Sequence, residues 1–309
     1  MSNLTTGKIN PNQPPKGHRA IRWGRLGLLL AAAVLLAWLL TIAGLSWFYT
    51  RALLHPSCSP HAHEPPGFET VSITTPDGVT LTGWWHAPSN GAAIVLLPGH
   101  AGTRDALLPD ALLLAQAGYG ILTLDSRGCS GVSASLGYLE AGDADAMADF
   151  VLNQPAVNAV GVLGFSAGGV AAIRSAAHNP EIRAVVAQGN YRDLAHEITN
   201  RVSAPWSLEW QLQHGVRLAM GIQLGLPPGE VNPARDLARI APRPVFLIHG
   251  EQESENNRAE EQYRLAGEPK ILWVVPGSAH GGYFQAAPEE YRRRILQFFD
   301  SAFGFEETR

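Results

Sequence analysis

The stretch VGVLGFSAGG, residues 160–169, decides the fold of this chain. Its apolar first half has the length of a buried strand, and a run with helical spacing follows from Val170 to Ala177. Between them lies the pattern Gly-x-Ser-x-Gly, centred on Ser166. Such a turn lifts the serine hydroxyl clear of a sheet and aims a helix N-terminus at it, where N–H groups favour an oxyanion. The stretch therefore predicts that Ser166 is a nucleophile.

A histidine is the expected partner of this serine, because a serine hydroxyl is a weak nucleophile until a base takes its proton. His280 lies in a glycine-rich loop, residues 277–282, directly after the last apolar run of the chain. Core packing does not explain a histidine in such a loop. We therefore predict that His280 is the base.

A carboxylate should orient this base. Three glutamates compete in the loop after the apolar run at residues 245–248, and Asp193 is a further candidate. Glu251 lies in the first turn of that loop and has a short reach. Glu255 stands beside two asparagines, where it is better placed to cap a helix, and Glu253 lies between the two. The residues alone leave this choice open.

Two backbone N–H groups are candidates for binding an oxyanion. One belongs to Ala167, directly after the serine, and the other to His100 in the loop at residues 98–102, which follows a short apolar run. The side chain of His100 is not expected to take part.

The pattern on either side of the serine predicts an α/β fold. Alternating apolar residues flank the turn Pro76-Asp77-Gly78, which is typical of an antiparallel hairpin. Short apolar runs then alternate with helical segments up to residue 190 and again from residue 245. This alternation indicates a mostly parallel sheet with helices on both faces. One helix is expected to begin with solvated acids, namely Asp143, Asp145 and Asp149.

The segment at about residues 190–240 interrupts this alternation, and we interpret it as a short helical cap. Trp206 and Trp210 are four positions apart and would share one face of a helix. We predict that this face binds the substrate, with plain packing as the alternative.

An uncharged apolar run from Leu26 to Tyr49 predicts a membrane helix, since about 20 apolar residues cross the hydrocarbon core. Aromatic residues close the run, as at a membrane interface, and lysine and arginine are concentrated ahead of it. This bias predicts a single-pass protein with a cytoplasmic N-terminus and an extracytoplasmic catalytic domain. A cleaved signal peptide is the alternative, but its apolar region would be shorter.

These features divide the chain into five parts. They are a disordered cytoplasmic tail at 1–25, a transmembrane helix at 26–49, a linker at 50–68, an α/β domain at 69–302 with the cap at about 190–240, and a tail at 303–309.

Composition excludes several other classes of protein. The chain has 309 residues and a formal net charge of −4, so it presents no basic field for nucleic acid. We find no phosphate-binding loop, no dinucleotide-binding glycine pattern and no set of metal ligands, and we predict neither cofactor nor metal. Two cysteines, Cys58 and Cys129, are too few for a disulfide framework, and whether they pair is left open. The oligomeric state is likewise left open.

The segments together resemble the α/β-hydrolase superfamily over about residues 69–302. Within it they are most similar to the membrane-anchored Bem46-like and ABHD-type hydrolases. The resemblance rests on the hairpin motif at 75–78, the loop at 97–99, the segment at 125–133, the Gly-x-Ser-x-Gly turn, His249-Gly250 and His280.

This resemblance implies a triad in the chain order serine, acid, histidine. It places the acid at Glu253, four residues after His249, although relatives usually carry aspartate there. It also implies supporting, structural roles for Asp125 and Arg127. Many relatives have His-Gly where this chain has Pro98-Gly99, a departure that leaves the backbone donor in place.

The resemblance implies hydrolysis of a carboxylic ester through an acyl-enzyme. A lipid-like ester, such as an acylglycerol or a lysophospholipid, is the expected substrate because the anchor keeps the domain near a bilayer. The alternatives are a serine peptidase or amidase acting outside the cytoplasm, and a non-catalytic binding protein on the same fold. The presence of serine, acid and histidine in this order argues against the binding protein.

Overall fold

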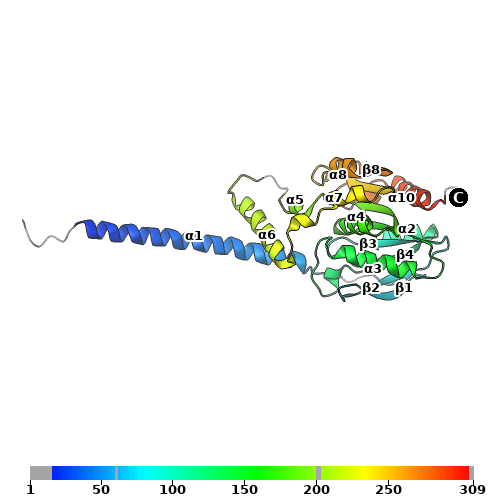
Figure 1. Cartoon of the computed structure of the whole chain (residues 1–309), viewed down its shortest axis with the longest axis horizontal. Coiled ribbons are helices and arrows are strands. Elements are labelled where there is room, and N and C mark those ends of the chain that lie inside the picture. Colours follow the sequence, from blue (N-terminus) through cyan, green and yellow to red (C-terminus); the bar gives the residue numbers. More distant parts are fainter. Residues whose placement is uncertain (1–15, 60–61, 200–202, 306–309) are drawn as a thin grey trace, which may run out of the picture.

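An eight-stranded sheet runs through the globular part of the chain, and a long helix projects from it (Figure 1). The computed structural model describes residues 16–59, 62–199 and 203–305, and side chains from residue 23 onward. The strands are β1 (Glu69–Thr74), β2 (Thr80–His86), β3 (Ala92–Leu97), β4 (Gly120–Leu124), β5 (Ala159–Phe165), β6 (Ile182–Gln188), β7 (Val245–Gly250) and β8 (Lys270–Val275).

The strand order is β1-β2-β4-β3-β5-β6-β7-β8. β1 and β2 form an antiparallel hairpin, β2 lies antiparallel to β4, and all other neighbours are parallel. β3 and β4 are buried along their whole length, which explains why they are continuous apolar runs in the sequence. The predicted fold class, a mostly parallel sheet with an N-terminal hairpin, is confirmed.

Helices cover both faces of this sheet and bury its side chains in two clusters. On one face α3 and α4 pack over β3 and β5, and on the other α2 and α10 pack over the same strands. Each fully buried large apolar side chain, such as Phe299, contributes roughly 1.5–3 kcal/mol to folding. The helices are α2 (Leu108–Gln116), α3 (Glu140–Leu152), α4 (Ala167–His178), α8 (Ala259–Leu265), α9 (Tyr283–Ala286) and α10 (Pro288–Phe303), with the 3₁₀ turn η1 (Arg127–Cys129).

The N-terminal helix is longer at both ends than predicted. Helix α1 (Lys16–Leu54) includes residues 16–25, for which the sequence predicts a disordered tail, and extends past Tyr49. No proline interrupts it, and extending a formed helix costs little, so it continues on both sides of the apolar run. It ends one residue before His55, where Pro56 disfavours a helical conformation. The rest of the predicted tail, residues 1–15, and the end of the C-terminal tail, residues 306–309, lie outside the described residues.

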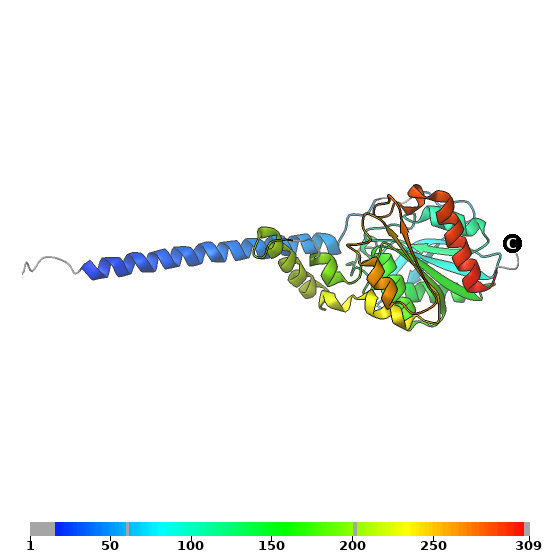
Figure 2. The same cartoon turned by 90° about the horizontal axis from the view of Figure 1, so that it is seen from above.

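The segment Trp23–Leu54 of α1 is long and apolar enough to cross a membrane. In Figures 1 and 2 it projects from the domain as a single rod. Most of its apolar side chains, including Leu29, Val34 and Phe48, are exposed.

The interruption at residues 190–240 is built mostly of helices, among them α5 (Leu194–Thr199), α6 (Leu208–Leu224) and α7 (Pro233–Asp236), with the 3₁₀ turns η2 (Pro228–Glu230) and η3 (Leu237–Arg239). Its longest helix, α6, lies beside the C-terminal half of α1 in both views (Figures 1 and 2).

The end of α1 is fastened to loops at the C-terminal edge of the parallel strands. The N–H of Ala134 donates to Leu54 O at 2.8 Å. Cys58 and Cys129 form a disulfide with their Cα atoms 5.6 Å apart, which answers the question that the sequence left open. The C-terminal edge of the sheet, where the serine turn lies, therefore faces α1.

One charged group of the sequence has a different environment from the one predicted. Asp143 is not solvated, because it is 4% exposed and accepts two hydrogen bonds from Arg127. Arg127 also pairs with Asp77 of the hairpin turn, and Asp125 pairs with Arg104 at 2.6 Å. Burial raises the pKa of the Asp143 carboxyl to about 6, although Arg127 opposes that rise. The resemblance correctly implied structural roles for Asp125 and Arg127.

Candidate active site

The turn between β5 and α4 holds Ser166 in a strained conformation, with φ 54° and ψ −119°. A residue other than glycine adopts positive φ only when its surroundings enforce it, at a cost of about 1–3 kcal/mol. A side chain on Gly164 would overlap Gly168 O, and a side chain on Gly168 would overlap Leu97 O. Both glycines are therefore needed for the turn and for its contact with the loop after β3.

Neighbouring strands hold this turn in place. The N–H of Ser166 donates to Gln188 O, at the end of β6, over 2.7 Å. The serine thus lies at the edge where β5 and β6 end together.

The structure brings His280 and Glu253 into direct contact from two different loops. Nδ1 of His280 hydrogen-bonds Glu253 Oε2. An ionised carboxylate can only accept, so Nδ1 carries the proton and Nε2 is left as an acceptor. This is the tautomer that a base for a serine hydroxyl requires.

Three further donors hold the Glu253 carboxylate. Oε1 accepts from the Tyr283 hydroxyl and from the N–H of Gly250 at 2.9 Å, and Oε2 accepts from Asn257 Nδ2 at 3.1 Å. Burial favours the neutral acid, but the hydrogen bonds outweigh it and hold the pKa of Glu253 below its ordinary value. Glu253 is therefore ionised at neutral pH.

Sequence reasoning missed Tyr283 and Asn257, whose side chains complete this site. Tyr283 is 2% exposed, and burial followed by the Glu253 charge raises the pKa of its hydroxyl. The sequence shows only a tyrosine three residues after His280; its burial, which makes its hydroxyl require a partner, is visible only in the structure.

The competing acids lie elsewhere. Asp193 caps α5 by accepting from the N–H of His196 at 2.7 Å and pairs with Arg192. Glu251 is exposed and accepts from the N–H of Gly277 at 2.8 Å. Glu255 is exposed and does not cap α8, which begins after Arg258. Of the four candidates, only Glu253 contacts the ring of His280.

The His280 ring lies next to the serine turn. Its centroid is 4.7 Å from that of Phe165, the residue before Ser166. A Cβ on Gly189, which follows β6, would lie 2.9 Å from Cε1 of His280. The ring therefore covers the ends of the two strands that hold Ser166.

Of the two predicted oxyanion donors, Ala167 directly follows the serine and His100 belongs to the loop that packs against Gly168. Ala167 is the first residue of α4, so its N–H has no acceptor within the helix. His100 follows Pro98-Gly99, which the turn brings against Gly168. The His100 side chain is not incidental, because its Nε2 donates to Leu53 O of α1 over 2.5 Å.

A second histidine, His249, lies next to this pair and is fully buried. Within the described part of the chain, neither of its ring nitrogens has a hydrogen-bond partner. Burial lowers the pKa of His249 to about 4, with Glu253 opposing the change. It is therefore a neutral, structural residue.

The predicted tryptophan face is wrong in one respect. Ser207 caps α6 by accepting from the N–H of Trp210 at 3.2 Å, so Trp206 precedes the helix. Trp206 has a φ of 67°. The two tryptophans still meet, with ring centroids 5.0 Å apart. Trp206 is 77% exposed, and the substrate contact predicted for the pair stays a prediction.

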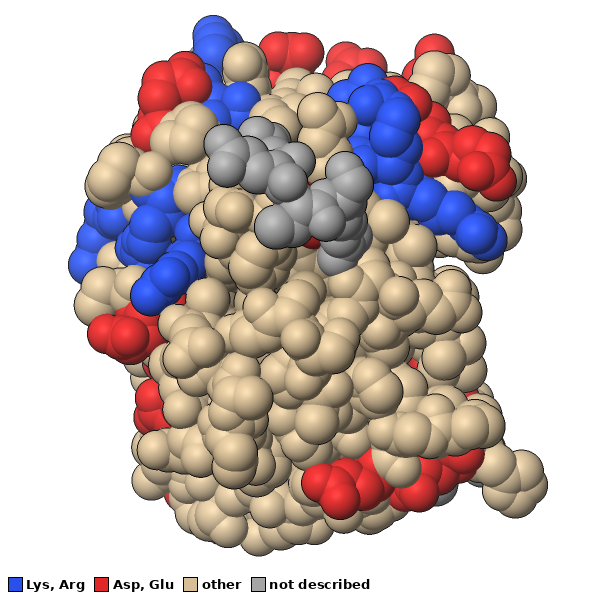
Figure 3. All heavy atoms as spheres, turned by 90° about the vertical axis from the view of Figure 1, so that its right-hand side faces the viewer, with Lys and Arg blue, Asp and Glu red and all other residues tan. Residues whose placement is uncertain are grey.

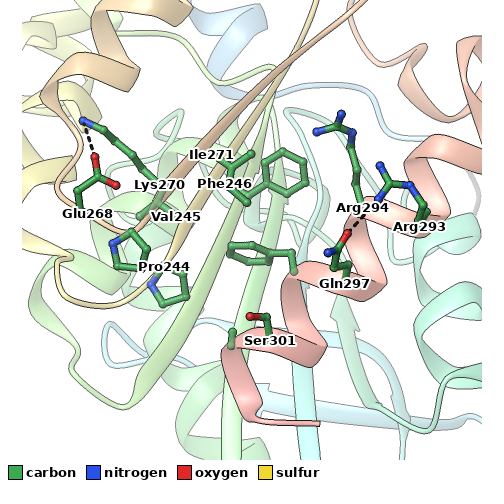
Figure 4. A pocket seen from close by; sticks show the side chains of 13 residues that line it. Pro244, Val245, Phe246, Glu268, Lys270, Ile271, Arg293, Arg294, Gln297 and Ser301 are labelled. Atoms are coloured by element: carbon green, nitrogen blue, oxygen red, sulfur yellow. Dashed lines mark hydrogen bonds and ion pairs between the residues drawn. The ribbon is translucent and has the colours of Figure 1, made fainter. Parts of the chain in front are cut away.

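A groove of about 570 Å³ lies away from these residues (Figure 4). It is lined by the first residues of β7 and β8, Val245 and Lys270, and by α10. The first residues of parallel strands lie at the sheet edge opposite to Ser166. Lys270 pairs with Glu268 there at 3.7 Å. Figure 3 shows charges of both signs on the face of the domain remote from α1, where no single-sign patch dominates.

The chain is similar in sequence and in fold to several known proteins. No model of a protein family matches the chain. It is 24% identical over 288 residues to the uncharacterized protein YfhR of Escherichia coli O157:H7, covering 89% of this chain and 93% of that protein. A stretch of 64 residues is 39% identical to the uncharacterized protein PA2218 of Pseudomonas aeruginosa, covering 21% of this chain and 17% of that protein.

Two solved structures of hydrolases have a similar fold. The esterase Pf2001 of Pyrococcus furiosus is similar with a TM-score of 0.61 and 26% identity, over 81% of this chain and 97% of that one. The dienelactone hydrolase of Anabaena variabilis is similar with a TM-score of 0.54 and 21% identity, over 76% of this chain and 99% of that one.

The chain has the α/β-hydrolase fold. The predicted superfamily is confirmed, and the esterases and hydrolases among its structural neighbours support a hydrolase. The names of these proteins do not mention a Bem46-like or ABHD-type hydrolase, and the narrower resemblance gains no support from them. On this fold the serine turn stands at the C-terminal ends of the strands, where α/β-hydrolases carry their nucleophile.

Proposed function

We propose that this α/β-hydrolase is a membrane-anchored serine esterase with Ser166 as nucleophile, His280 as base and Glu253 as orienting carboxylate. One observation carries the proposal. An ionised, four-fold hydrogen-bonded Glu253 contacts His280, whose ring packs against the residue before Ser166. The fold alone would not specify this chemistry, because it hosts many functions.

The reaction follows from the protonation states. Ser166 Oγ attacks the ester carbonyl while its proton passes to Nε2 of His280. The tetrahedral intermediate then collapses, the ester C–O bond breaks, and His280 returns the proton to the departing alkoxide. Water repeats the sequence on the acyl-enzyme and releases the acid and free Ser166. Glu253 stays ionised throughout and stabilises the imidazolium that forms in each half.

The N–H groups of Ala167 and His100 are the proposed donors to the oxyanion. Each is preorganised, the first by the start of α4 and the second by a loop pressed against Gly168. In known enzymes the loss of one such donor costs about 10²–10³ in kcat.

A lipid-like ester is the proposed substrate. The edge of the sheet that bears Ser166 faces α1, to which it is joined through His100 and Leu53. If α1 is an anchor, the site opens close to a bilayer, where acylglycerols and lysophospholipids reside. The substrate contacts of Trp206 and Trp210 belong to this proposal.

The proposed location is a single-pass membrane protein with the domain outside the cytoplasm. Basic residues ahead of Leu26 support a cytoplasmic N-terminus. The disulfide between Cys58 and Cys129 supports an oxidising compartment for the domain. A reporter that is active only outside the cytoplasm, fused after Arg309, should be active. A mature protein that begins near Gly44 would instead indicate a signal peptide.

A substrate panel tests the proposed activity. The purified full chain in detergent is assayed on acyl esters of graded chain length and on matched aminoacyl amides. Esters should be cleaved, with kcat/KM rising with acyl length. Cleavage of the amides alone would make the protein a peptidase or amidase, and a chain that cleaves neither and resists fluorophosphonate labelling would be a binding protein.

A further inference from the structure

Helix α6 is held along α1 by contacts spread over several turns. Nε1 of Trp38 donates to Gln211 Oε1 at 2.8 Å, and Gly215 lies so close to Ser46 that a side chain on the glycine would overlap the serine hydroxyl. Ser46 is 1% exposed. α6 is therefore packed on the apolar rod itself.

The position of Trp38 along α1 sets the depth of α6. This step rests on the proposed anchoring. If the membrane span begins after Arg25, about 20 residues cross the hydrocarbon core, and the span ends near Leu45. Trp38 lies about seven residues before that point, which is about 10 Å at 1.5 Å per residue. The first turn of α6, which is bonded to Trp38, must then lie below the membrane surface.

The exposed surface of α6 suits this depth. Leu208, Leu218 and Ile222 are 51%, 67% and 60% exposed. Glu209 is nine residues from Leu218, and Arg217 is nine residues from Leu208. Because about nine residues make two and a half turns, each charged residue lies on the side of the helix opposite to its leucine. Such a helix lies in a membrane interface with its apolar face about 5–10 Å deep.

The apolar face of α6 also continues the surface of α1. Gln211, Gly215, Leu218 and Ile222 follow one another at helical spacing and form one stripe. Its first two members contact α1, and the last two are exposed. The exposed part thus joins the exposed apolar side chains of the rod, which favours lipid over a soluble partner as its occupant.

We propose that α6 is a membrane-embedded arm of the domain. Leu208, in the turn that is bonded to Trp38, contacts the acyl chains of the bilayer. Gln223 donates to Trp47 O at 3.2 Å, so the end of the arm that carries Leu218 and Ile222 lies nearer to the membrane surface. The arm and α1 together fix the tilt of the domain, so that the edge bearing Ser166 faces the lipid.

Quenching by brominated lipid tests this arrangement. The full chain, with a fluorophore on a single introduced cysteine, is reconstituted into phosphatidylcholine vesicles that carry bromine on the acyl chains. The native cysteines are paired in a disulfide and do not compete for the label. The sites are Leu208→Cys on the first turn of the arm, Arg217→Cys on the opposite side and nearer to the surface, Leu35→Cys in the anchor and Leu265→Cys as an exposed control on α8.

The expected result is that the label at position 208 loses nearly as large a fraction of its emission as the label at 35. The label at 265 should lose none, and the label at 217 should lose clearly less than the one at 208. Quenching at 35 without quenching at 208 overturns the proposal. No quenching at 35 overturns the anchoring and the arm with it. Far-ultraviolet circular dichroism verifies folding independently of the proposed activity, and Trp206→Cys replaces Leu208→Cys if the latter does not fold.

Discussion

The turn around Ser166 and the arm formed by α6 differ in what fixes their geometry. At the turn, Gly164 and Gly168 are close in sequence to the serine, and their lack of side chains enforces its conformation. The arm instead depends on Trp38, which lies 173 positions before its partner Gln211. A local pattern predicted the first region, whereas distant contacts decide the second. Changes near the turn should therefore act on catalysis, and changes near the arm on membrane contact.

The largest expected effect is that of Glu253→Gln. It should lower kcat by up to about 10⁴-fold, because a neutral amide stabilises neither the required tautomer nor the imidazolium. Glu251→Gln is the matched control and should remain near wild type, since the hydrogen bond that its carboxylate accepts within the described part of the chain comes from the Gly277 N–H. The kcat of both variants is measured on a soluble ester. An inactive Glu251→Gln with an active Glu253→Gln would move the acid to position 251.

Removal of the disulfide should weaken the link between the end of α1 and the loop after β4. It closes a loop with a sequence separation of 71, so Cys58→Ser with Cys129→Ser should lower the free energy of unfolding by about 2–5 kcal/mol. Urea denaturation of the full chain in detergent, followed by domain fluorescence, measures the difference. Reductant should destabilise the wild type and leave the double variant unchanged. Equal stability of the two proteins would contradict the structural role of the disulfide.

His100→Ala should lower catalysis because it shifts the loop that bears the proposed oxyanion donor, and not because the His100 side chain takes part in the reaction. Without the bond to Leu53 O, the loop that bears the proposed oxyanion donor loses one of its fixed points. We expect kcat to fall by about 10-fold to 100-fold with KM little changed, less than the full loss of a donor. His100→Gln, whose amide can also donate, should restore part of the activity.

His86→Ala is the matched control for this experiment, because His86 makes a similar bond to Gly67 O at 2.7 Å far from the serine. A similar fall in kcat for both variants would mean that His100 acts only on general stability.

Tyr283→Phe should have the smallest effect. Glu253 has a pKa below its ordinary value of 4.5, so its hydrogen bonds stabilise the fold above that pH and lose this contribution as pH falls through the folded-state pKa. Removing the Tyr283 hydroxyl should lower the free energy of unfolding by about 1–3 kcal/mol at neutral pH. The difference from wild type should shrink as the pH falls below 4.5 and through the folded-state pKa of Glu253, as denaturation at a series of pH values would reveal. A difference independent of pH would mean that Tyr283 contributes only by packing.

The sequence predicted the sheet and the serine turn because each depends on short-range spacing, whereas the resemblance placed the acid at Glu253. Glu253 lies three residues after β7, so the strand fixes where its side chain emerges. The sequence could not predict that Asp143 is buried. Its partner Arg127 belongs to a loop that comes next to Asp143 only in the folded chain.

The start of α6 was predictable in part. Ser207 is a favourable N-cap, and this signal places Trp206 outside the helix. The packing of α6 on α1 was not predictable from the sequence. Small residues such as Gly215 and Ser46 indicate a close helix contact only when the partner helix is known.

The central claim, that Ser166 is the nucleophile, is tested most directly by covalent labelling. The full chain and Ser166→Ala are treated with a fluorophosphonate probe, and the labelled peptide is identified by mass spectrometry. The account predicts one label, on Ser166, with no label on the variant and a loss of kcat of about 10⁴-fold or more despite intact folding. A label on another residue, or a Ser166→Ala variant that keeps most of its esterase activity, would contradict it.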